Sequence, residues 1–270
     1  MGMRIYNNIE AVNAHRQLGI SNANMSKSME RLASGLRINR AADDAAGLAV
    51  SESMRSRIRG DQVAMRNAQD GISMVQVADG ALGTTVDMLQ RVRDLAVQAA
   101  NGVLTSTQRS NLQAEVANIM QEVDATGQNT EFNTHKILMN ASMTIQVGAA
   151  SGQVVTLQTV TVSQAALGIS GIDISTMTGA VAALASVDLA ISTLVSNRAA
   201  MGAIQNRLEQ VISRLGVTTE NLQAAESRIR DADMAAEMVD FTKNQILQQS
   251  GTAMLAQANQ APQGILQLLR

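Results

Sequence analysis

Apolar residues in the last third of the chain recur in alternating steps of four and three. The stripe from residue 204 to residue 229 consists of Ile204, Leu208, Val211, Leu215, Thr218, Leu222, Ala225 and Ile229. Heptad spacing keeps these positions on one face of a helix, which is typical of a coiled-coil seam. Met234, Met238 and Phe241 continue the stripe, so we expect the C-terminal part of the chain to be helical.

The N-terminal half carries partner stripes for this seam. One stripe is formed by Met25, Met29, Leu32 and Leu36, and a longer one by Met54, Ile58, Met65, Ile72, Val75, Leu82, Val86 and Leu89. Asp43 or Asp44 is placed to cap the helix that carries the longer stripe, and Gly102 is placed to end it. This helix is expected to span about residues 44–100, which at roughly 1.5 Å per residue gives a length of about 80 Å.

A further helix is predicted from Ser106 to about Asp124, and the period changes after it. Apolar and polar residues alternate strictly at Met143, Thr144, Ile145, Gln146 and Val147. The turn-like sequence GAASG and the β-branched run VVTLQTVTV follow. This pattern predicts a β-hairpin near residues 141–165, on the outside of a helical bundle.

The expected fold is therefore mainly α, a long antiparallel helical coiled-coil bundle with a small β-hairpin. Aromatic residues make up 1% of the chain, whereas a thick core normally depends on such large side chains. Small apolar side chains suit helices that lie close together along their length. The chain has one proline, Pro262, so very long helices are permitted.

Both ends of the chain carry apolar residues at helical spacing. Chain ends in a soluble monomer are usually polar and frayed, so this stripe has to be covered. The simplest cover is other copies of the same chain; the alternative is a helix pair satisfied within one molecule. A head-to-tail contact that does not close generates a filament. The assembly residues we expect are Ile5, Ile9, Val12, Met238, Phe241, Leu255, Ile265, Leu266 and Leu269.

Charge and cysteine content exclude several classes of function. A net charge of −2 gives no electrostatic attraction to nucleic acid or anionic lipid, and we expect no nucleic-acid partner. The chain contains no cysteine, which excludes disulfides, thiolate metal sites and cysteine nucleophiles. No run approaches 18 consecutive apolar residues, so no membrane insertion is expected. The start, MGMRIYNNIE, lacks the apolar region of a secretory signal peptide, which indicates the cytoplasm unless export uses another route.

We find no catalytic constellation and expect no enzyme, no metal and no cofactor. The two histidines, His15 and His135, lie in different regions without a ligand-spaced partner. The Asp43–Asp44 pair resembles an acid–base pair, but its place at the start of a helix favours capping. The same reading, or pairing with neighbouring arginines, applies to the aspartates in RIRDADM.

Blocks at both ends of the chain closely resemble bacterial flagellin. RLASGLRINRAADDAAGLAVSESMRSRIRG (31–60) and RNAQDGISMVQVADGAL (66–82) are similar to the N-terminal signature of that family. GAIQNRLEQVISRL (202–215), NLQAAESRIRDADMAAEM (221–238) and MLAQANQAPQGILQLL (254–269) are similar to its C-terminal signature. With the flanking helices, the resemblance covers nearly everything outside residues 140–180.

The resemblance implies a structural subunit that polymerises into the flagellar filament for motility. Residues 1–43 and 232–270 would pair as a discontinuous inner coiled-coil domain, and residues 44–231 would form a helical rod with the hairpin. Only about 40 residues stand where flagellins usually insert outer domains, which implies a minimal form and a smooth, thin filament. The implied location is extracellular, after export through the flagellar secretion channel without a cleaved signal peptide. Implied partners are other copies, an export chaperone, the secretion apparatus, and hook-associated and cap proteins.

The resemblance also implies a partner outside the bacterium, Toll-like receptor 5, which recognises flagellins of some bacteria. The segments similar to that epitope are LQRVRDLAVQAANG (89–102) and LQAEV (112–116). By position, Arg91, Leu95 and Glu115 would contact the receptor, with Gln90 as a lesser contact. The same residues also fit a role as surface or inter-subunit residues of the rod.

The chain departs from the family pattern at three places. Tyr6 stands in a start that more often reads Ile-Asn-x-Asn, and Thr134 and His135 stand where FNG is usual. Asp61 stands where a neutral residue is common after RIRG, and we expect it to form a surface ion pair with Arg57 or Arg59.

Two other functions fit part of the pattern. The hook–filament junction protein shares the terminal helices, although its C-terminal block is usually less faithful to SRIRDADMAAEM and QANQ. A cytoplasmic coiled-coil adaptor would explain the heptads but neither the apolar chain ends nor the paired blocks.

Overall fold

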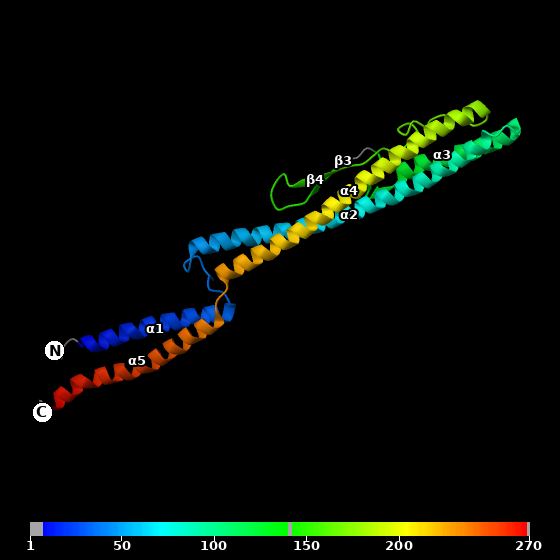
Figure 1. Ribbon diagram of the computed structural model, residues 1–270. Coiled ribbons are helices and arrows are strands. Elements are labelled where there is room, and N and C mark those ends of the chain that lie inside the picture. Colours follow the sequence, from blue (N-terminus) through cyan, green and yellow to red (C-terminus); the bar gives the residue numbers. More distant parts are fainter. Residues whose placement is uncertain (1–7, 140–141, 269–270) are drawn as a thin grey trace. The chain divides into compact units, whose positions relative to one another are not determined.

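The computed structural model describes residues 8–139 and 142–268, with side chains described as far as residue 260. The predicted fold class is confirmed, because long helices dominate and a small hairpin accompanies them (Figure 1). The helices of the described residues are α1 (Ile9–Ser34), α2 (Ala45–Ala99), α3 (Ser106–Asn129), α4 (Met177–Arg230) and α5 (Met234–Leu268). The chain forms two compact units: a terminal unit of Met1–Ser56 with Asn221–Arg270, and a central unit of Arg57–Glu220.

The predicted start of α2 is confirmed, and its cap is Asp44. The Asp44 Oδ1 accepts a hydrogen bond from the Gly47 N–H at 2.8 Å, which satisfies one of the free donors of the first turn. The predicted end near residue 100 is confirmed within one residue, since α2 ends at Ala99. The guanidinium of Arg109 donates to the Ala99 carbonyl at 2.8 Å and to the Asn101 carbonyl at 3.0 Å. A side chain from α3 therefore ends α2 where the sequence favoured a glycine.

Helix α3 begins where predicted and ends later than predicted. Thr105 and Gln108 form a reciprocal capping box at its start. The helix continues to Asn129, and Gly127 in its last turn allows a close approach of another segment. A Cβ atom at Gly127 would lie 1.9 Å from the Val162 carbonyl oxygen. The sequence-based end at Asp124 followed the last large apolar residue, and such a contact of the backbone leaves no signal of that kind.

The predicted hairpin is strand β3 (Ser142–Gln146) paired antiparallel with β4 (Val154–Gln158). Met143 lies opposite Leu157 and Ile145 opposite Val155, so alternate side chains face the helices. Val155 and Leu157 are fully buried. The alternation of apolar and polar residues in the sequence therefore predicted both the strands and the face of the hairpin that is buried.

A second, shorter hairpin pairs β1 (Glu131–Phe132) with β2 (His135–Lys136) and was not predicted. Its two-residue turn consists of Asn133 and Thr134, with φ angles of 49° and 65°. Positive φ at both positions defines the type I′ geometry that usually selects asparagine followed by glycine. Thr134 holds a β-branched side chain in this left-handed conformation, which is strained.

The core of the central unit is closed and thin. Large aliphatic side chains from α2, α3, α4 and β4 meet in it and are buried: Leu82, Leu89, Val92, Val116, Val123, Leu157 and Leu194. Alanines are buried between them at Ala78, Ala96, Ala99, Ala180, Ala183 and Ala190. These small residues allow helices to pack closely with few aromatic side chains. Of the predicted seam in α4, Leu208 and Leu215 are buried and Ile204 and Val211 are half-buried.

The expected surface role of Asp61 is wrong. Asp61 is 3% exposed, and the described residues contain no ion pair between it and Arg57 or Arg59. Helical spacing explains the result, because Asp61 shares the buried face of α2 with Ile58 and Ala64 while both arginines are exposed. Arg59, two residues away, does not face Asp61 on a helix. Arg57, four residues away, has a spacing at which side chains can meet, but its side chain is exposed whereas Asp61 is buried.

One helix, α4, contains a stretch of 18 residues that is long and apolar enough to cross a membrane by length and composition. Polar residues interrupt this stretch, so it contains no unbroken apolar run of 18 residues and the sequence pattern does not reveal it. Ala180, Ala183, Val187, Ala190 and Leu194 of α4 are buried in the core of the central unit. Packing within the central unit buries 28% of this stretch, whereas Val181, Leu189 and Val195 of α4 are exposed.

Replacement of Thr134 by glycine is expected to stabilise the β1–β2 hairpin. Relief of the left-handed strain should contribute about 1 kcal/mol, partly offset by the greater freedom of glycine in the unfolded chain. Slower hydrogen exchange of the Ile137 amide, which donates to the Thr130 carbonyl at 3.3 Å, would report the gain. The Thr134→Ala variant keeps a Cβ atom and should show no comparable gain; equal protection in both variants would contradict the explanation.

Candidate assembly surfaces

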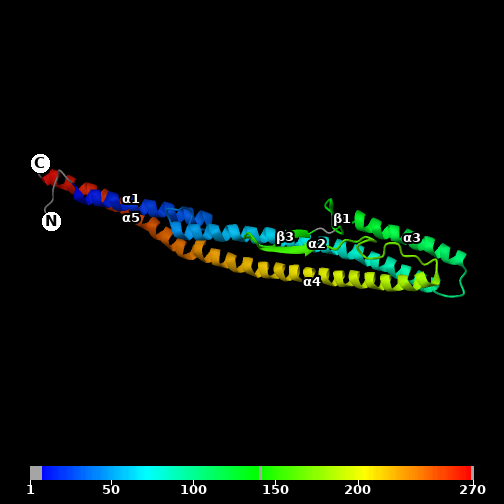
Figure 2. The same ribbon diagram turned by 90° about the horizontal axis from the view of Figure 1, so that it is seen from above.

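Helices α1 and α5 of the terminal unit lie side by side and antiparallel (Figure 1; Figure 2). At one end, the Asn8 Nδ2 donates to the Ala258 carbonyl at 2.7 Å. At the other end, the Arg31 guanidinium lies 3.4 Å from the Glu237 carboxylate. These contacts join residues more than 200 positions apart and pair the two ends of the chain.

The seam between α1 and α5 is built mostly from small and polar residues. In α1 the half-buried and buried positions at heptad spacing are Ala11, Ala14, Leu18, Ser21, Met25 and Ser28. In α5 they are Glu237, Phe241, Asn244, Gln248, Gly251, Leu255 and Ala258. A Cβ atom at Gly251 would lie 2.9 Å from the Leu18 Cδ1, so the helices approach closely there. The pairing therefore covers little large apolar surface.

Large apolar side chains of the terminal unit point away from the seam. Val12 is 68% exposed, Val239 and Ile246 are each 65% exposed, and Met254 is 63% exposed. Ile9, Ile20, Met29, Met234, Met238 and Leu247 are exposed as well. Exposed apolar area of this extent marks an interaction surface, because isolated soluble proteins rarely leave it uncovered.

The assembly residues predicted from the sequence fall into three groups. Ile9, Val12 and Met238 belong to the exposed surface, whereas Phe241 and Leu255 lie half-buried in the seam. Ile5 and Leu269 lie outside the described residues, as do the side chains of Ile265 and Leu266.

Sequence reasoning missed Val239, Ile246 and Met254, which are among the most exposed apolar residues of α5. Val239 and Ile246 are seven residues apart, and this spacing was available as a signal. Each helix carries two stripes, one toward its partner helix and one outward. The prediction of a single stripe on each helix was therefore incomplete.

The linkers that join α1 to α2 and α4 to α5 are hydrogen-bonded to each other. The Arg37 N–H donates to the Arg230 carbonyl at 2.7 Å, and the Ala232 N–H donates to the Gly35 carbonyl at 3.0 Å. An isolated antiparallel bridge pairs Leu36 with Asp231. Gly35 ends α1 with a φ of 71°, the left-handed conformation that lets the chain leave the helix.

Ion pairs and caps surround the linkers. Asp43 lies 2.8 Å from the Lys27 ammonium, and its Oδ2 also accepts from the Arg40 and Asn39 N–H groups. These bonds, with that from Lys27 the largest, lower the pKa of Asp43 to about 2. Hydrogen bonds from Arg230 and then from Arg55 lower the pKa of Glu52. Asp43 thus organises the loop before α2, while its neighbour caps the helix.

The two aspartates in RIRDADM, Asp231 and Asp233, make different contacts. Asp233 caps α5, since its Oδ1 accepts from the Ala235 N–H at 2.9 Å and the Ala236 N–H at 3.2 Å. Asp231 accepts from the Ser227 hydroxyl at 2.6 Å.

The candidate receptor residues of the central unit are only partly accessible. Arg91 is exposed and donates to the Glu115 Oε1 through Nε at 3.0 Å and Nη2 at 2.6 Å, joining α2 to α3. Gln90 is exposed beside it. Leu95 is 1% exposed and belongs to the core, so in this conformation it offers no surface to a partner.

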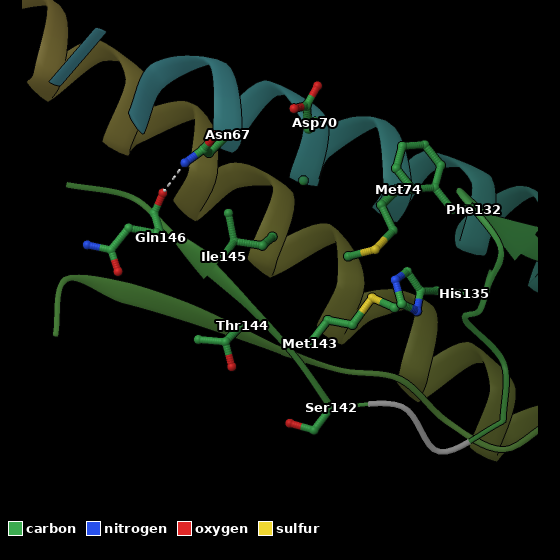
Figure 3. Close-up of a pocket in the computed structure, with 11 residues that line it drawn as sticks. Asn67, Asp70, Met74, Phe132, His135, Ser142, Met143, Thr144, Ile145 and Gln146 are labelled. Atoms are coloured by element: carbon green, nitrogen blue, oxygen red, sulfur yellow. Dashed lines mark hydrogen bonds between the residues drawn. The ribbon is translucent and has the colours of Figure 1, made fainter. Parts of the chain in front are cut away.

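An open cavity of about 690 Å³ lies between α2 and the two hairpins (Figure 3). Its apolar side chains are those of Met74, Phe132, Met143 and Ile145. The Asn67 Nδ2 donates to the Gln146 carbonyl at 3.2 Å beside it. His135 is directed toward Met143, while the Asp70 carboxylate points away from the strand. The only histidine of the cavity therefore does not meet its carboxylate as an acid–base pair. Among the described residues, no three histidine, aspartate or glutamate side chains form a metal-binding group.

A helix pair with an uncovered apolar face, continuous in sequence with a helical unit that has its own closed core, defines a self-assembling structural subunit. Residues 5–143 match the bacterial flagellin N-terminal helical region, and residues 184–269 match the bacterial flagellin C-terminal helical region. The chain belongs to the bacterial flagellin family, whose members are structural proteins.

Similar proteins match along nearly the entire chain. The flagellar filament 33 kDa core protein of Treponema phagedenis is 48% identical over 286 residues, covering 99% of this chain and 100% of that protein. A flagellin of Halalkalibacterium halodurans is 48% identical over 272 residues with the same coverage of each chain. The crystal structure of Bacillus cereus flagellin is 30% identical and covers 56% of this chain and 88% of that one, with a TM-score of 0.51.

The low pKa of Asp43 gives the linker region an acid-sensitive contribution to stability. Because the pKa is lower in the folded protein than its ordinary value of 3.8, this contribution is present above about pH 4 and is lost as the pH falls through about 2. Carbon NMR of the Asp43 carboxyl should show a midpoint near 2. In Lys27→Gln the midpoint should move toward 3.8, and an unchanged midpoint would show that Lys27 does not cause the shift.

Proposed function

We propose that this flagellin subunit polymerises by burying the outward apolar faces of α1 and α5 against those of other copies. The protein is a structural subunit of the flagellar filament, and self-assembly is the activity of its family. The observation that supports this mechanism is the contrast between a small, polar seam and large, exposed aliphatic side chains. Because the helix pair leaves these large apolar side chains exposed, their burial against other copies would favour association.

The size of the exposed surface supports the same mechanism. Among the side chains of α1 and α5 that the structure describes, ten large apolar ones are exposed: Ile9, Val12, Ile20, Met29, Met234, Met238, Val239, Ile246, Leu247 and Met254. Completing the burial of a partly exposed aliphatic side chain contributes on the order of 1 kcal/mol. Together they contribute roughly 10 kcal/mol, which is comparable with the cost of association, about 4–15 kcal/mol.

We further propose the domain boundaries that the resemblance implies. Residues 1–43 and 232–270 form the inner coiled-coil domain of the filament, and residues 44–231 form a rod around it. Asp44, which caps α2, and Asp233, which caps α5, lie close to these boundaries in the sequence. About 40 residues separate the two helical halves, which favours a minimal filament without large outer domains.

The proposed location is outside the cell, after export through the flagellar secretion channel without a cleaved signal peptide. Before assembly, the exposed aliphatic face of α5 needs a cover, which is the task of an export chaperone. Hook-associated and cap proteins are the proposed partners at the two ends of the filament. These partners follow from membership of the family and from the uncovered terminal helices.

The mechanism is tested by placing charge on the outward face. Val239→Asp combined with Ile246→Asp should raise the critical concentration for polymerisation by at least about tenfold, because each change removes apolar burial and adds a desolvation cost. Sedimentation of polymer at several protein concentrations would measure the effect, and circular dichroism would confirm that the helices remain.

The matched control is Gln249→Asp, which adds charge at an exposed polar position of the same helix. This variant should polymerise close to normally. If the Val239 and Ile246 double variant formed filaments at the usual concentration, the outward face would not be the assembly surface.

Recognition by Toll-like receptor 5 is a second proposal, supported by the exposure of Gln90 and Arg91 and by the Arg91–Glu115 pair. Since Leu95 is buried, we restrict the contact to the three polar residues. In a reporter-cell assay with monomer, Arg91→Ala should lower potency by about tenfold, as loss of an interfacial arginine typically does.

Arg93→Ala is the control for this assay. Arg93 is also an exposed arginine of α2 in the same segment, but it pairs with Asp188 of α4 at 2.7 Å and is not one of the proposed contact residues. Equal activity of wild type, Arg91→Ala and Arg93→Ala would remove the proposal for this chain.

A further inference from the structure

Methionine supplies much of the exposed apolar surface of the terminal helices. The chain has 16 methionines and no cysteine. Six of the methionines that the structure describes are exposed, and four of these lie on α1 and α5: Met29, Met234, Met238 and Met254. Their exposed fractions run from 46% to 63%, so solvent reaches a large part of each side chain. They are four of the ten residues of the proposed assembly surface.

The four methionines are spread over the outward surface of both helices. Met234 and Met238 are about one helical turn apart and share a face of α5. Met254 lies seven residues after Leu247, another exposed apolar residue, and therefore on the same face as that leucine. Met29 lies near the end of α1, the other helix of the pair. A change in the polarity of these side chains would therefore alter the assembly surface along much of α5 and on α1.

The thioether is the one group of this surface that a mild oxidant converts into a polar group. The sulfur lone pair attacks one oxygen of hydrogen peroxide, so that an S–O bond forms and the O–O bond breaks. The sulfur loses two electrons to the peroxide, whose other oxygen leaves with both protons as water. The product, methionine sulfoxide, is polar where the thioether was apolar. Burial of its oxygen without a hydrogen-bond donor is costly.

Burial separates these methionines from others in the chain. Met74, Met120 and Met201 are at most 6% exposed and lie in the core of the central unit. Peroxide reaches them only when the core opens, whereas it meets the exposed methionines in the folded subunit. Since the chain has no cysteine, no thiol competes for the oxidant. Peroxide therefore changes the surface of the subunit before its core.

We propose that Met29, Met234, Met238 and Met254 are oxidation sites that control assembly, because their sulfoxides make the outward surface too polar to be buried against other copies. This inference rests on the proposed assembly mechanism, since it assigns a consequence to oxidation of that surface. Assembly covers the same thioethers, so the unassembled subunit is the sensitive form. Enzymatic reduction of the sulfoxides restores the apolar surface.

Peroxide treatment of the unassembled full chain, followed by removal of the peroxide with catalase, tests the proposal. Peptide mass spectrometry should find oxidation of the four methionines at least about tenfold faster than that of Met74, Met120 and Met201. The critical concentration for polymerisation, measured by sedimentation, should rise by at least about tenfold. Methionine sulfoxide reductases for both sulfoxide epimers should return it to the starting value.

A variant with leucine at all four positions isolates their contribution: Met29→Leu, Met234→Leu, Met238→Leu and Met254→Leu. Leucine keeps the volume and apolar character but does not react with peroxide, so the untreated variant should polymerise close to normally. After peroxide treatment its critical concentration should stay within about twofold of the untreated value.

The matched control is Met139→Leu combined with Met177→Leu. These methionines are 48% and 52% exposed, but they belong to the central unit. The control variant should lose polymerisation after peroxide treatment as the wild type does. The reductase experiment uses the unsubstituted chain, so it decides the question even if the four-leucine variant assembles poorly.

Four results would overturn the proposal: normal polymerisation of the oxidised wild type, peroxide inactivation of the four-leucine variant, protection by the control substitutions alone, and loss of helix in the oxidised wild type by circular dichroism. The assembly mechanism is tested separately, by Val239→Asp combined with Ile246→Asp without oxidant. If that double variant is defective while the oxidised wild type polymerises normally, the assembly surface stands and its control by oxidation does not.

Discussion

The seam between α1 and α5 is the contact on which the terminal unit depends, and it is made mainly of small and polar side chains. Small residues let the helices approach closely, as at Gly251 beside Leu18, but they bury little apolar area. The large aliphatic residues of the same helices face outward. The helix pair therefore leaves most of its large apolar surface uncovered, and the proposed assembly would bury this surface against other copies.

The central unit has the opposite arrangement. Its largest aliphatic residues, such as Leu82 and Leu194, are buried among three helices and a hairpin, and alanines fill the remaining space. This unit has its own core and does not need a neighbour to complete it. One chain thus combines a unit that has its own buried core with a helix pair that exposes large apolar residues, and this contrast is what the proposed assembly mechanism requires.

Much of this structure was predictable from periodicity, because long helices and the β3–β4 hairpin follow directly from spacings of 3.5 and 2 residues. Three features were not. Asp61 lies on the buried face of α2, where helical geometry outweighs its proximity in sequence to two arginines. Thr134 occupies a left-handed turn that its own side chain disfavours. Val239 and Ile246 form a second stripe on α5, which a search for one stripe per helix does not separate from the first.

The hydrogen-bonded linkers have a mechanical consequence. A pull on the terminal helices reaches the rest of the chain through two covalent strands, and the bonds at Arg37–Arg230 and Gly35–Ala232 tie these strands together. Tension is then shared between them, and a twist applied to one is transmitted to the other. A rotating filament places its subunits under both tension and torsion. Two linkers that are hydrogen-bonded to each other resist such forces better than a single flexible linker.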